Sequence, residues 1–315
     1  MLNSEKGSAL VIILVISTLL LASSFWAVST YKEGVRTTEQ FLDKMQARLG
    51  AESALQILKY YGATGQFGSS TLSRQLPEKL NFPNTIRLTG DEYTLSLQDM
   101  TVTVSLLDSS ALLNCFYMDI KTLARLLYAF GMEDEQLSVY VNSYRDWIDK
   151  NDFHHVNGAE SYYYKHELKA AFSPRNSKAM QSPWEMSLIK GMDDTRWKEL
   201  RSFLMLSPKP GLNIQTMSPR MLSAHFGVDM SQALQLARYR RENGYLTNST
   251  IEATIGRIFV DEYSGLNNFP SRIVRLRIEA SAGDARERYL GWVTFIPDRQ
   301  GPFRILSWTE GGGDE

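Results

Sequence analysis

Oxygen-bearing side chains crowd one short segment of the sequence, YRDWIDKNDFHHVNGAESYYY, at residues 144–164. Carboxylate and amide oxygens are hard ligands of the kind that calcium binds in proteins. Three roles are open to such a segment: a catalytic site, a cation site, or a solvated turn whose Asp and Asn residues cap helix ends. The candidate metal-binding carboxylates are those of Asp146, Asp149, Asp152 and Glu160.

The spacing of these residues is partly that of an EF-hand. If Asp149 is position one, then Asn151, Asn157 and Glu160 fall at positions three, nine and twelve, which an EF-hand also uses. Position six is His154, where an EF-hand has Gly, so the segment is not an EF-hand. The ligand chemistry nevertheless suits calcium.

Asp146 precedes Asp149 by three residues, a spacing that puts both carboxylates on one face of a helix. Without a cation these two groups would repel each other and the neighbouring carboxylates of Asp152 and Glu160. The residue types alone leave a calcium site and a solvated loop both open.

Zinc and catalysis are less well supported by the same sequence. His154 and His155 are adjacent and rarely could both reach one ion, and only His166 and His225 remain to complete a tetrahedral set. The sequence holds no phosphate-binding Gly loop, no G-x-S-x-G and no H-E-x-x-H. The single cysteine, Cys115, stands among apolar residues and is expected to be a buried thiol rather than a nucleophile. We therefore predict that the protein is not an enzyme.

The N-terminal residues must place this segment on one side of a membrane. Residues 8–28 carry no charge and no proline, and about 21 residues suffice to span the hydrocarbon core of a bilayer. A cleavable secretory signal, a plain signal anchor and a pilin-like leader all begin with such a stretch. In the pilin-like case the polar heptapeptide 1–7 is removed after Gly7, and Ser8 becomes the new N-terminus with the apolar helix retained.

The sequence after the apolar stretch favours the pilin-like leader. No proline occurs before Pro77, so residues 8–61 can form one continuous helix, roughly 80 Å long at 1.5 Å per residue. Phe41, Met45 and Leu49 recur every four residues, and Leu42, Leu55 and Leu58 lie close to the same stripe. This spacing predicts an amphipathic helix with one face buried against a folded head.

The rest of the chain predicts an α+β protein with an antiparallel sheet. Residues 62–87 are rich in Gly, Ser and Thr and are expected to form a loop. Strand-like alternation follows at 91–110 and returns at 271–284, 285–298 and 302–310. Helical patterns dominate between the two sets, with helix starts at Asp193-Asp194 and at Ser218-Pro219. The predicted domains are a leader (1–7), a transmembrane helix (8–28), a pilin-like domain in two parts (29–115 and 266–315) and an inserted all-α domain (116–265).

A helix-hairpin-helix-like unit within the insert raises the possibility of DNA binding. Arg238, Arg240 and Arg241 supply local positive charge near the hairpin. Against this, Asp229 follows the hairpin and would repel phosphate, and the formal net charge of the chain is -1. A helical packing module is the favoured interpretation, and nucleic-acid binding is not predicted.

The order of these elements and two of these segments resemble the K-type minor pseudopilins (GspK) of bacterial type II secretion systems. The segments are DWIDKNDFHHVNGAESYYY and LNIQTMSPRMLSAHFGV, and the resemblance covers essentially the whole chain. Pilins usually carry a glutamate at the fifth mature position, which here is Ile12. Its absence suits a subunit with no neighbour above it, because no adjacent N-terminal amine then needs a partner.

The resemblance implies both a function and a ligand. The protein is expected to be an inner-membrane, single-pass protein with its head in the periplasm, cleaved and methylated at Ser8 by the prepilin peptidase. It would join the I- and J-type minor pseudopilins in a tip complex that initiates or caps the pseudopilus, together with the major pseudopilin fibre and the inner-membrane assembly platform. Calcium is implied at Asp149, Asp152 and Glu160 most directly. The alternative is a minor pilin of a type IV pilus, with a role in pilus initiation, adhesion or DNA uptake.

Overall fold

The structure, a computed structural model, describes residues 4–76, 82–97, 100–176, 180–207, 211–256, 269–299 and 301–311, with side chains from residue 11 onward. Its helices are α1 (Ser4–Thr64), α2 (Ile120–Ala129), α3 (Asp134–Ile148), α4 (Asp194–Leu200), α5 (Pro219–Phe226), α6 (Met230–Asn243) and α7 (Asn248–Ile255). Its strands are β1 (Gln66–Phe67), β2 (Thr71–Ser73), β3 (Thr85–Arg87), β4 (Thr89–Leu97), β5 (Met100–Asp108), β6 (Leu113–Asn114), β7 (Leu204–Met205), β8 (Ile273–Ala282), β9 (Ala285–Thr294) and β10 (Arg304–Glu310).

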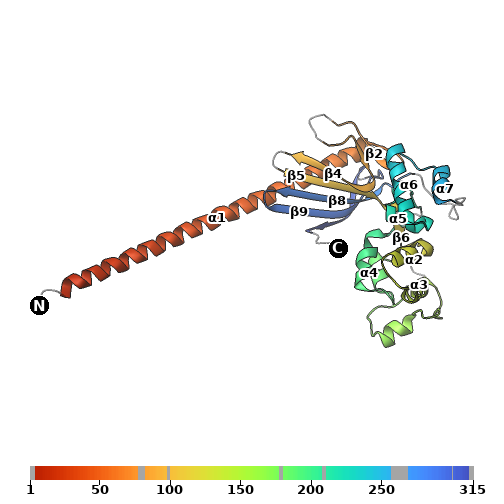
Figure 1. The fold of residues 1–315 in the computed structure, drawn as a ribbon, viewed down its shortest axis with the longest axis horizontal. Coiled ribbons are helices and arrows are strands. Elements are labelled where there is room, and N and C mark those ends of the chain that lie inside the picture. Colours follow the sequence, from red (N-terminus) through yellow and green to blue (C-terminus); the bar gives the residue numbers. More distant parts are fainter. Residues whose placement is uncertain are drawn as a thin grey trace.

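Helix α1 confirms the predicted rod. It runs unbroken from Ser4 to Thr64, and at 1.5 Å per residue it is about 90 Å long. Its N-terminal half projects away from the rest of the molecule, and its C-terminal half lies against the sheet (Figure 1). The part from Val11 to Thr64 is long and apolar enough to cross a membrane.

The buried face of α1 is not the one that the sequence predicts. Phe41, Met45 and Leu49 are 63%, 44% and 53% exposed, so the prediction is wrong for this stripe, although Leu58, which is predicted to lie close to it, is fully buried. The buried positions instead begin at Ala47 and follow one face through Ala51, Ala54, Leu58 and Tyr61. Small side chains here let the helix axis approach the sheet closely, which larger residues would prevent.

Gly50 marks the closest approach between this helix and the sheet. A Cβ atom at this position would lie 3.0 Å from Cγ2 of Val102 in β5, tighter than ordinary van der Waals contact. Gly50 is therefore a packing requirement of the helix, which outweighs the cost of a glycine in a helix interior.

The main sheet has five antiparallel strands in the order β10-β9-β8-β5-β4. Alternate residues of the central strands β5 and β8 are buried, as expected for strands with one face on a core. The buried residues of β5 and β8 form one core cluster with the C-terminal half of α1. The predicted strands after residue 90 are thus confirmed, and a turn at Gly283-Asp284 joins β8 to β9.

Residues 62–87, predicted as a loop, contain a small second sheet. Strands β1, β2 and β3 pair in order, all antiparallel. They are two or three residues long, too short for an alternation pattern to reveal them, and Tyr61 and Leu72 anchor them in the core beside α1.

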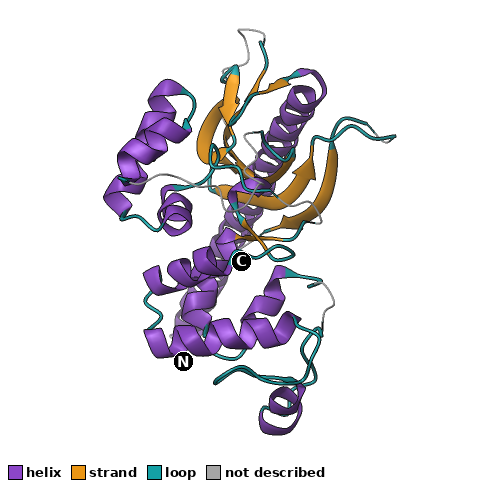
Figure 2. Cartoon of the chain, turned by 90° about the vertical axis from the view of Figure 1, so that its right-hand side faces the viewer, coloured by secondary structure: helices purple, strands orange, loops and turns teal. Residues whose placement is uncertain are grey.

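The helical insert leaves and rejoins the sheet at neighbouring strands. Asp108, the last residue of β5, is opposite Val274 at the start of β8. The insert therefore extends from one end of the sheet, opposite the N-terminus of α1 (Figures 1 and 2). It has a core of its own, and it is not purely helical, since β6 and β7 form a two-stranded parallel sheet within it.

Asp108 fixes this junction. Its carboxylate is fully buried and accepts hydrogen bonds from Asn213 Nδ2 (3.2 Å), Thr216 Oγ1 (3.1 Å) and the backbone N–H of Ser271 (3.0 Å). The hydroxyls of Ser110 and Ser271 also donate to it. One carboxylate thus joins the end of β5, the interior of the insert and the segment that returns to β8.

Candidate metal centre

The acidic loop begins where α3 ends. Asp146 lies in the last turn of α3 and is fully buried, while Asp149 is the C-cap residue with an extended backbone. The two side chains remain on one side of the chain, as the sequence spacing predicts. Asp149 also organises the next turn, because its carboxylate accepts from the backbone N–H of Asn151 at 3.2 Å and from Nδ2 of Asn151 at 2.9 Å.

The chain then folds back so that His155 reaches Asp146. The backbone N–H of His155 lies 3.0 Å from Asp146 Oδ1, and the ring Nδ1 forms a short contact with the same oxygen. Ligand atoms of Asp146, Asp149 and His155 all lie within 4.8 Å of one another. From the sequence alone, His155 is a candidate ligand for zinc only. No spacing rule predicts that it lies beside Asp146.

A tight turn holds the fold-back in place. Asn157 adopts a left-handed conformation with φ of 59°, and the N–H of Gly158 donates to the carbonyl of His155 at 2.8 Å. A Cβ atom on Gly158 would collide with Oδ2 of Asp146. From outside the loop, Nζ of Lys190 donates to the carbonyl of Gly158 at 3.3 Å. Gly158 is therefore required at this point because the backbone approaches a buried carboxylate.

Glu160 has a buried carboxylate whose oxygens lack hydrogen-bond partners among the described residues. Its side chain is only 5% exposed, and neither carboxylate oxygen has a hydrogen-bond partner among the described residues. Burial, together with the smaller effects of the nearby charges of Asp149, Asp146 and Asp152, raises its pKa to about 7. Only the backbone N–H of Ser161 opposes this rise in pKa. Buried carboxylates are nearly always hydrogen-bonded or bound to a cation. A bound cation would supply the partner that the oxygens of Glu160 lack.

Asp152 is exposed and is not one of the three grouped residues, although its negative charge helps to raise the pKa of Glu160. Glu160 is not one of the three grouped residues either, and its link to Asp146, Asp149 and Asp152 is the electrostatic repulsion that raises its pKa. The donor set is mainly oxygen, which suits calcium more than zinc. His166 stacks on Tyr162 with ring centroids 4.7 Å apart, and the Nδ1 atom of His225 lies 3.8 Å from Oδ2 of Asp119.

Aromatic residues support the cluster from behind. Trp147 and Tyr164 are fully buried and meet edge to face, with ring centroids 5.1 Å apart. Tyr164 belongs to a π-helical segment, Tyr163–Glu167, that follows directly after the acidic loop. Tyr162, in contrast, is 68% exposed. Trp147 follows Asp146 directly, and Tyr164 lies four residues after Glu160. The packed rings therefore hold the chain on both sides of the acidic loop.

The predicted processing residues lie in the first turns of α1. Gly7 and Ser8 belong to the continuous helix, and the structure describes only their backbone. Ile12, at the position where pilins carry glutamate, is 55% exposed on the apolar part of the helix.

The helix-hairpin-helix-like unit is a packing module. Helices α5 and α6 flank the hairpin, and Arg125 of α2 donates from Nη1 to the carbonyls of Ala224 and His225 at 3.0 Å each. The guanidinium of Arg125 also lies directly against Gly227 of the hairpin. These contacts tie the C-terminal end of α5 and the hairpin to α2.

Two of the three arginines near this hairpin are also engaged internally. Arg240 is buried and donates to the carbonyls of Ile214 at 2.7 Å and Met217 at 2.8 Å. Arg241 lies 3.7 Å from Asp91 of β4. These contacts join α6 to neighbouring segments and leave little positive charge for phosphate.

Comparison with known proteins finds the same family in the family model and in the curated relatives. The family model described as type II secretion system (T2SS), protein K, matches residues 115–209, which include the acidic loop. Type II secretion system protein K of Pectobacterium carotovorum subsp. carotovorum is 25% identical over 273 residues, covering 81% of each chain. The protein of the same name from Pseudomonas aeruginosa is 24% identical over 196 residues, covering 62% of this chain and 57% of that protein.

A solved structure has the same fold. It is the crystal structure of the GspK-GspI-GspJ complex from the enterotoxigenic Escherichia coli type 2 secretion system. The superposition gives a TM-score of 0.55 at 16% identity and covers 89% of this chain and 99% of that chain. The long helix, the antiparallel sheet and the helical insert of our structure are therefore a known arrangement. The chain is therefore similar to type II secretion system protein K, in the matched residues 115–209 and over 81% of its length.

Proposed function

We propose that this protein is a minor pseudopilin at the tip of the type II secretion pseudopilus, where it joins the I- and J-type minor pseudopilins and initiates or caps the fibre. It would be anchored in the inner membrane by α1, with its head in the periplasm. Processing by the prepilin peptidase would leave α1 in place for assembly on the inner-membrane platform and on the major pseudopilin fibre.

The position of the insert is the observation that carries this proposal. It lies at the end of the molecule opposite the N-terminus of α1 (Figure 1). In a fibre whose helices point their N-termini toward the membrane, this is the end at which the next subunit would stack. A folded helical domain there excludes such a neighbour, so the subunit suits the tip.

The sequence of the membrane half agrees with a tip position. Ile12 replaces the carboxylate that would otherwise accept an amine from an adjacent subunit. An unpaired carboxylate in lipid is energetically unfavourable. A subunit with no such neighbour is therefore more stable in the membrane with an apolar residue at position 12.

The exposed stripe on α1 suits a lateral partner. Phe41, Met45 and Leu49 lie on the part of the helix that is attached to the head, and they remain open to solvent in the isolated chain. A contiguous row of large apolar side chains on a soluble domain marks a protein contact. The solved relative is a complex with GspI and GspJ, which makes these two types of pseudopilin the proposed partners.

Calcium is the proposed ligand of the acidic loop. Asp146, Asp149 and Glu160 would hold it, with Asp152 supplying a further carboxylate from the solvent side. The ion would neutralise the mutual repulsion of these groups and join the end of α3 to the segment that leads into Tyr163–Glu167. The unpartnered oxygens of Glu160 support this assignment.

The proposed role is architectural and involves no catalysis. Cys115 is buried, and burial raises the pKa of its thiol to about 12, which is the opposite of what a nucleophile needs.

Co-purification tests the tip-complex proposal. The tagged full chain, co-expressed with I- and J-type minor pseudopilins, should retain both in detergent. Phe41→Asp with Leu49→Asp should release them without lowering the melting temperature, because both side chains are exposed. Gln40→Asp adds the same charge at an exposed position on another side of the helix and should retain both partners. Recovery of neither partner with the unmodified chain would refute the assignment.

A further inference from the structure

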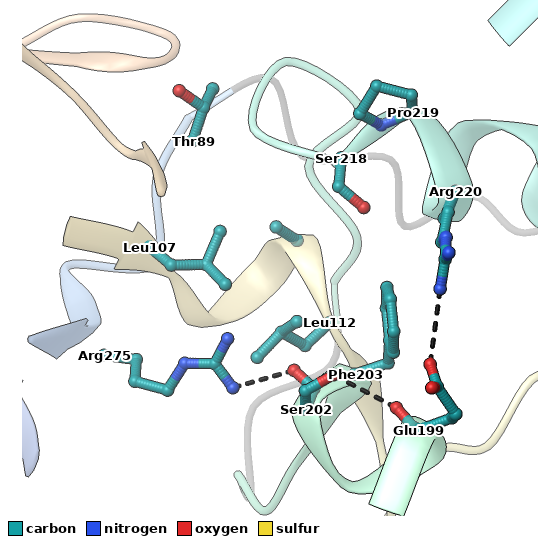
Figure 3. Close-up of a pocket in the computed structure, with 11 residues that line it drawn as sticks. Thr89, Leu107, Leu112, Glu199, Ser202, Phe203, Ser218, Pro219, Arg220 and Arg275 are labelled. Carbon is teal, nitrogen blue, oxygen red and sulfur yellow. Dashed lines mark hydrogen bonds and ion pairs between the residues drawn. The ribbon is translucent and has the colours of Figure 1, made fainter. Parts of the chain in front are cut away.

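A cavity lies at the seam between the main sheet and the insert, on the face of the sheet opposite α1 (Figure 3). Its volume is about 430 Å³, within the range of pockets that hold small ligands. Leu107 of β5 and Leu112 form its apolar floor, and Phe203, which ends the short 3-10 turn after α4, closes another side. None of these residues belongs to the acidic loop, so the cavity is a separate feature.

Arg275 of β8 brings a positive charge to this apolar cavity. Among the described residues its guanidinium makes one hydrogen bond, from Nη1 to the carbonyl of Ser202 at 2.7 Å. Burial lowers its pKa, with a smaller contribution from the like charge of Arg277, so the cation is poorly solvated where it stands. It stays protonated at neutral pH because arginine loses its proton only in strong base. The remaining N–H groups of the fork are left for an anion.

The opposite wall of the cavity offers a second donor. Ser218 is the N-cap of α5, and its Oγ accepts from the backbone N–H of Met221 at 3.3 Å. The hydroxyl proton has no acceptor among the described residues, and the side chain points toward the cavity in Figure 3. The N-terminal end of α5 adds a partial positive charge here.

The other charged residues at the rim largely cancel. Arg220 Nη1 lies 3.4 Å from Glu199 Oε2, and both side chains are more than half exposed. The charge left inside the cavity is that of Arg275. The cavity therefore has an anion-binding group on one side, a neutral donor on the other and apolar side chains between them.

We propose that this cavity binds the C-terminal residue of a polypeptide that ends in an apolar amino acid. The terminal carboxylate would meet Arg275, its side chain would lie on Leu107 and Leu112, and its acyl carbonyl would accept from Ser218. Two separated polar contacts favour a chain end over a simple fatty acid, which has only the carboxylate. A chain end bound here would touch both the sheet and the insert and so stabilise the angle between them.

N-acetyl-L-leucine is a suitable probe, and ligand-observed saturation-transfer NMR with the full chain in detergent micelles measures its binding. The acid should bind at least about tenfold more tightly than N-acetyl-L-leucinamide, which lacks the carboxylate. It should also bind more tightly than 4-methylpentanoate, which lacks the amide. Equal binding of the acid and the amide, or no signal up to about 20 mM, where even the weak fragment affinities expected for so few atoms are detectable, would overturn the proposal. Equal binding of 4-methylpentanoate would overturn the assignment to a chain end.

Two variants of one strand sharpen the test. Arg275→Gln should weaken binding of N-acetyl-L-leucine at least about tenfold. Arg277→Gln is the matched control, since Arg277 lies two residues along on the same face and pairs with Glu279 outside the cavity. An equal loss in both variants would overturn the role of Arg275. The comparison of acid with amide uses the unmodified chain, so the proposal stays testable even if Arg275→Gln unfolds.

Discussion

Replacing Glu160 with glutamine should change how the stability of the metal-free protein depends on pH. The pKa of this carboxyl is about 7 in the folded chain, against an ordinary value of 4.5. Between these values the folded chain keeps a proton that the unfolded chain releases. The contribution of Glu160 to stability is therefore most favourable below pH 4.5, falls as pH rises toward about 7, and stays low above that.

The size of the effect follows from the shift. At 1.36 kcal/mol per pKa unit, the displacement to about 7 corresponds to about 3 kcal/mol of unfavourable free energy once the carboxylate is ionised. The amide side chain of the Glu160→Gln variant cannot ionise, so the variant should lack this pH dependence. The difference in free energy of unfolding between the two proteins should thus change by about 3 kcal/mol between pH 5 and pH 8, with the variant gaining at pH 8.

Urea titrations in the presence of a chelator measure this difference. Trp147 is buried beside the acidic loop, so tryptophan fluorescence includes a local reporter. Glu167→Gln is the matched control, because Glu167 is exposed nearby and should give the same pH profile as the unmodified chain. If the Glu160→Gln and unmodified profiles stay parallel from pH 5 to pH 8, the raised pKa is wrong.

Calcium should remove most of the difference in stability between the two proteins at pH 8. A ligand present at 100 times its dissociation constant stabilises the folded state by about 2.7 kcal/mol, provided that it binds only that state. The unmodified chain should gain this stabilisation at pH 8, and Glu160→Gln should lose most of it because one carboxylate ligand is gone. A calcium response of equal size in both proteins would show that Glu160 is not a ligand.

Three further perturbations test other parts of the structure. Gly7→Val should block processing, so mass spectrometry should find the leader still attached instead of a methylated Ser8, and an unchanged mature N-terminus would contradict the pilin-like leader. Asp108→Ala should lower the free energy of unfolding by about 3–5 kcal/mol in urea, because several buried donors lose one acceptor; a loss below about 1 kcal/mol would show that the junction does not depend on it. Gly158→Ala should abolish the calcium-induced rise in melting temperature because its Cβ would strike Asp146, whereas Gly34→Ala, with open space around it, should leave that rise unchanged.

The elements that the sequence predicted well are those with local signals. The rod of α1 follows from an absence of proline, and α5 begins where Ser218 and Pro219 form an N-cap and first turn. The long strands after residue 90 follow from alternation over eight or more residues. Such signals are contained within one element, so they need no knowledge of what packs against it.

The acidic loop contains contacts that local sequence patterns do not predict. Spacing along a helix puts Asp146 beside Asp149, and the structure agrees. The approach of His155 to Asp146 depends on a left-handed residue at Asn157 and on the close packing of Gly158, neither of which has a periodic pattern. The seam cavity is less predictable still, because Ser218 at the start of α5 and Arg275 in β8 are far apart in the sequence and meet only through the fold.

The apolar stripe of α1 shows that a periodic pattern identifies which residues share a helix face but not what covers that face. Periodicity shows correctly that Phe41, Met45 and Leu49 share one face of the helix. It does not show what covers that face, and within this chain the sheet instead packs on the roughly opposite face, where Ala47, Ala51 and Gly50 permit close approach. Burying the large side chains against the sheet would hold the helix farther from it. A helix with one small face and one large face can therefore pack on its own sheet and still offer an apolar surface to a second helix, which is what a subunit of a fibre requires.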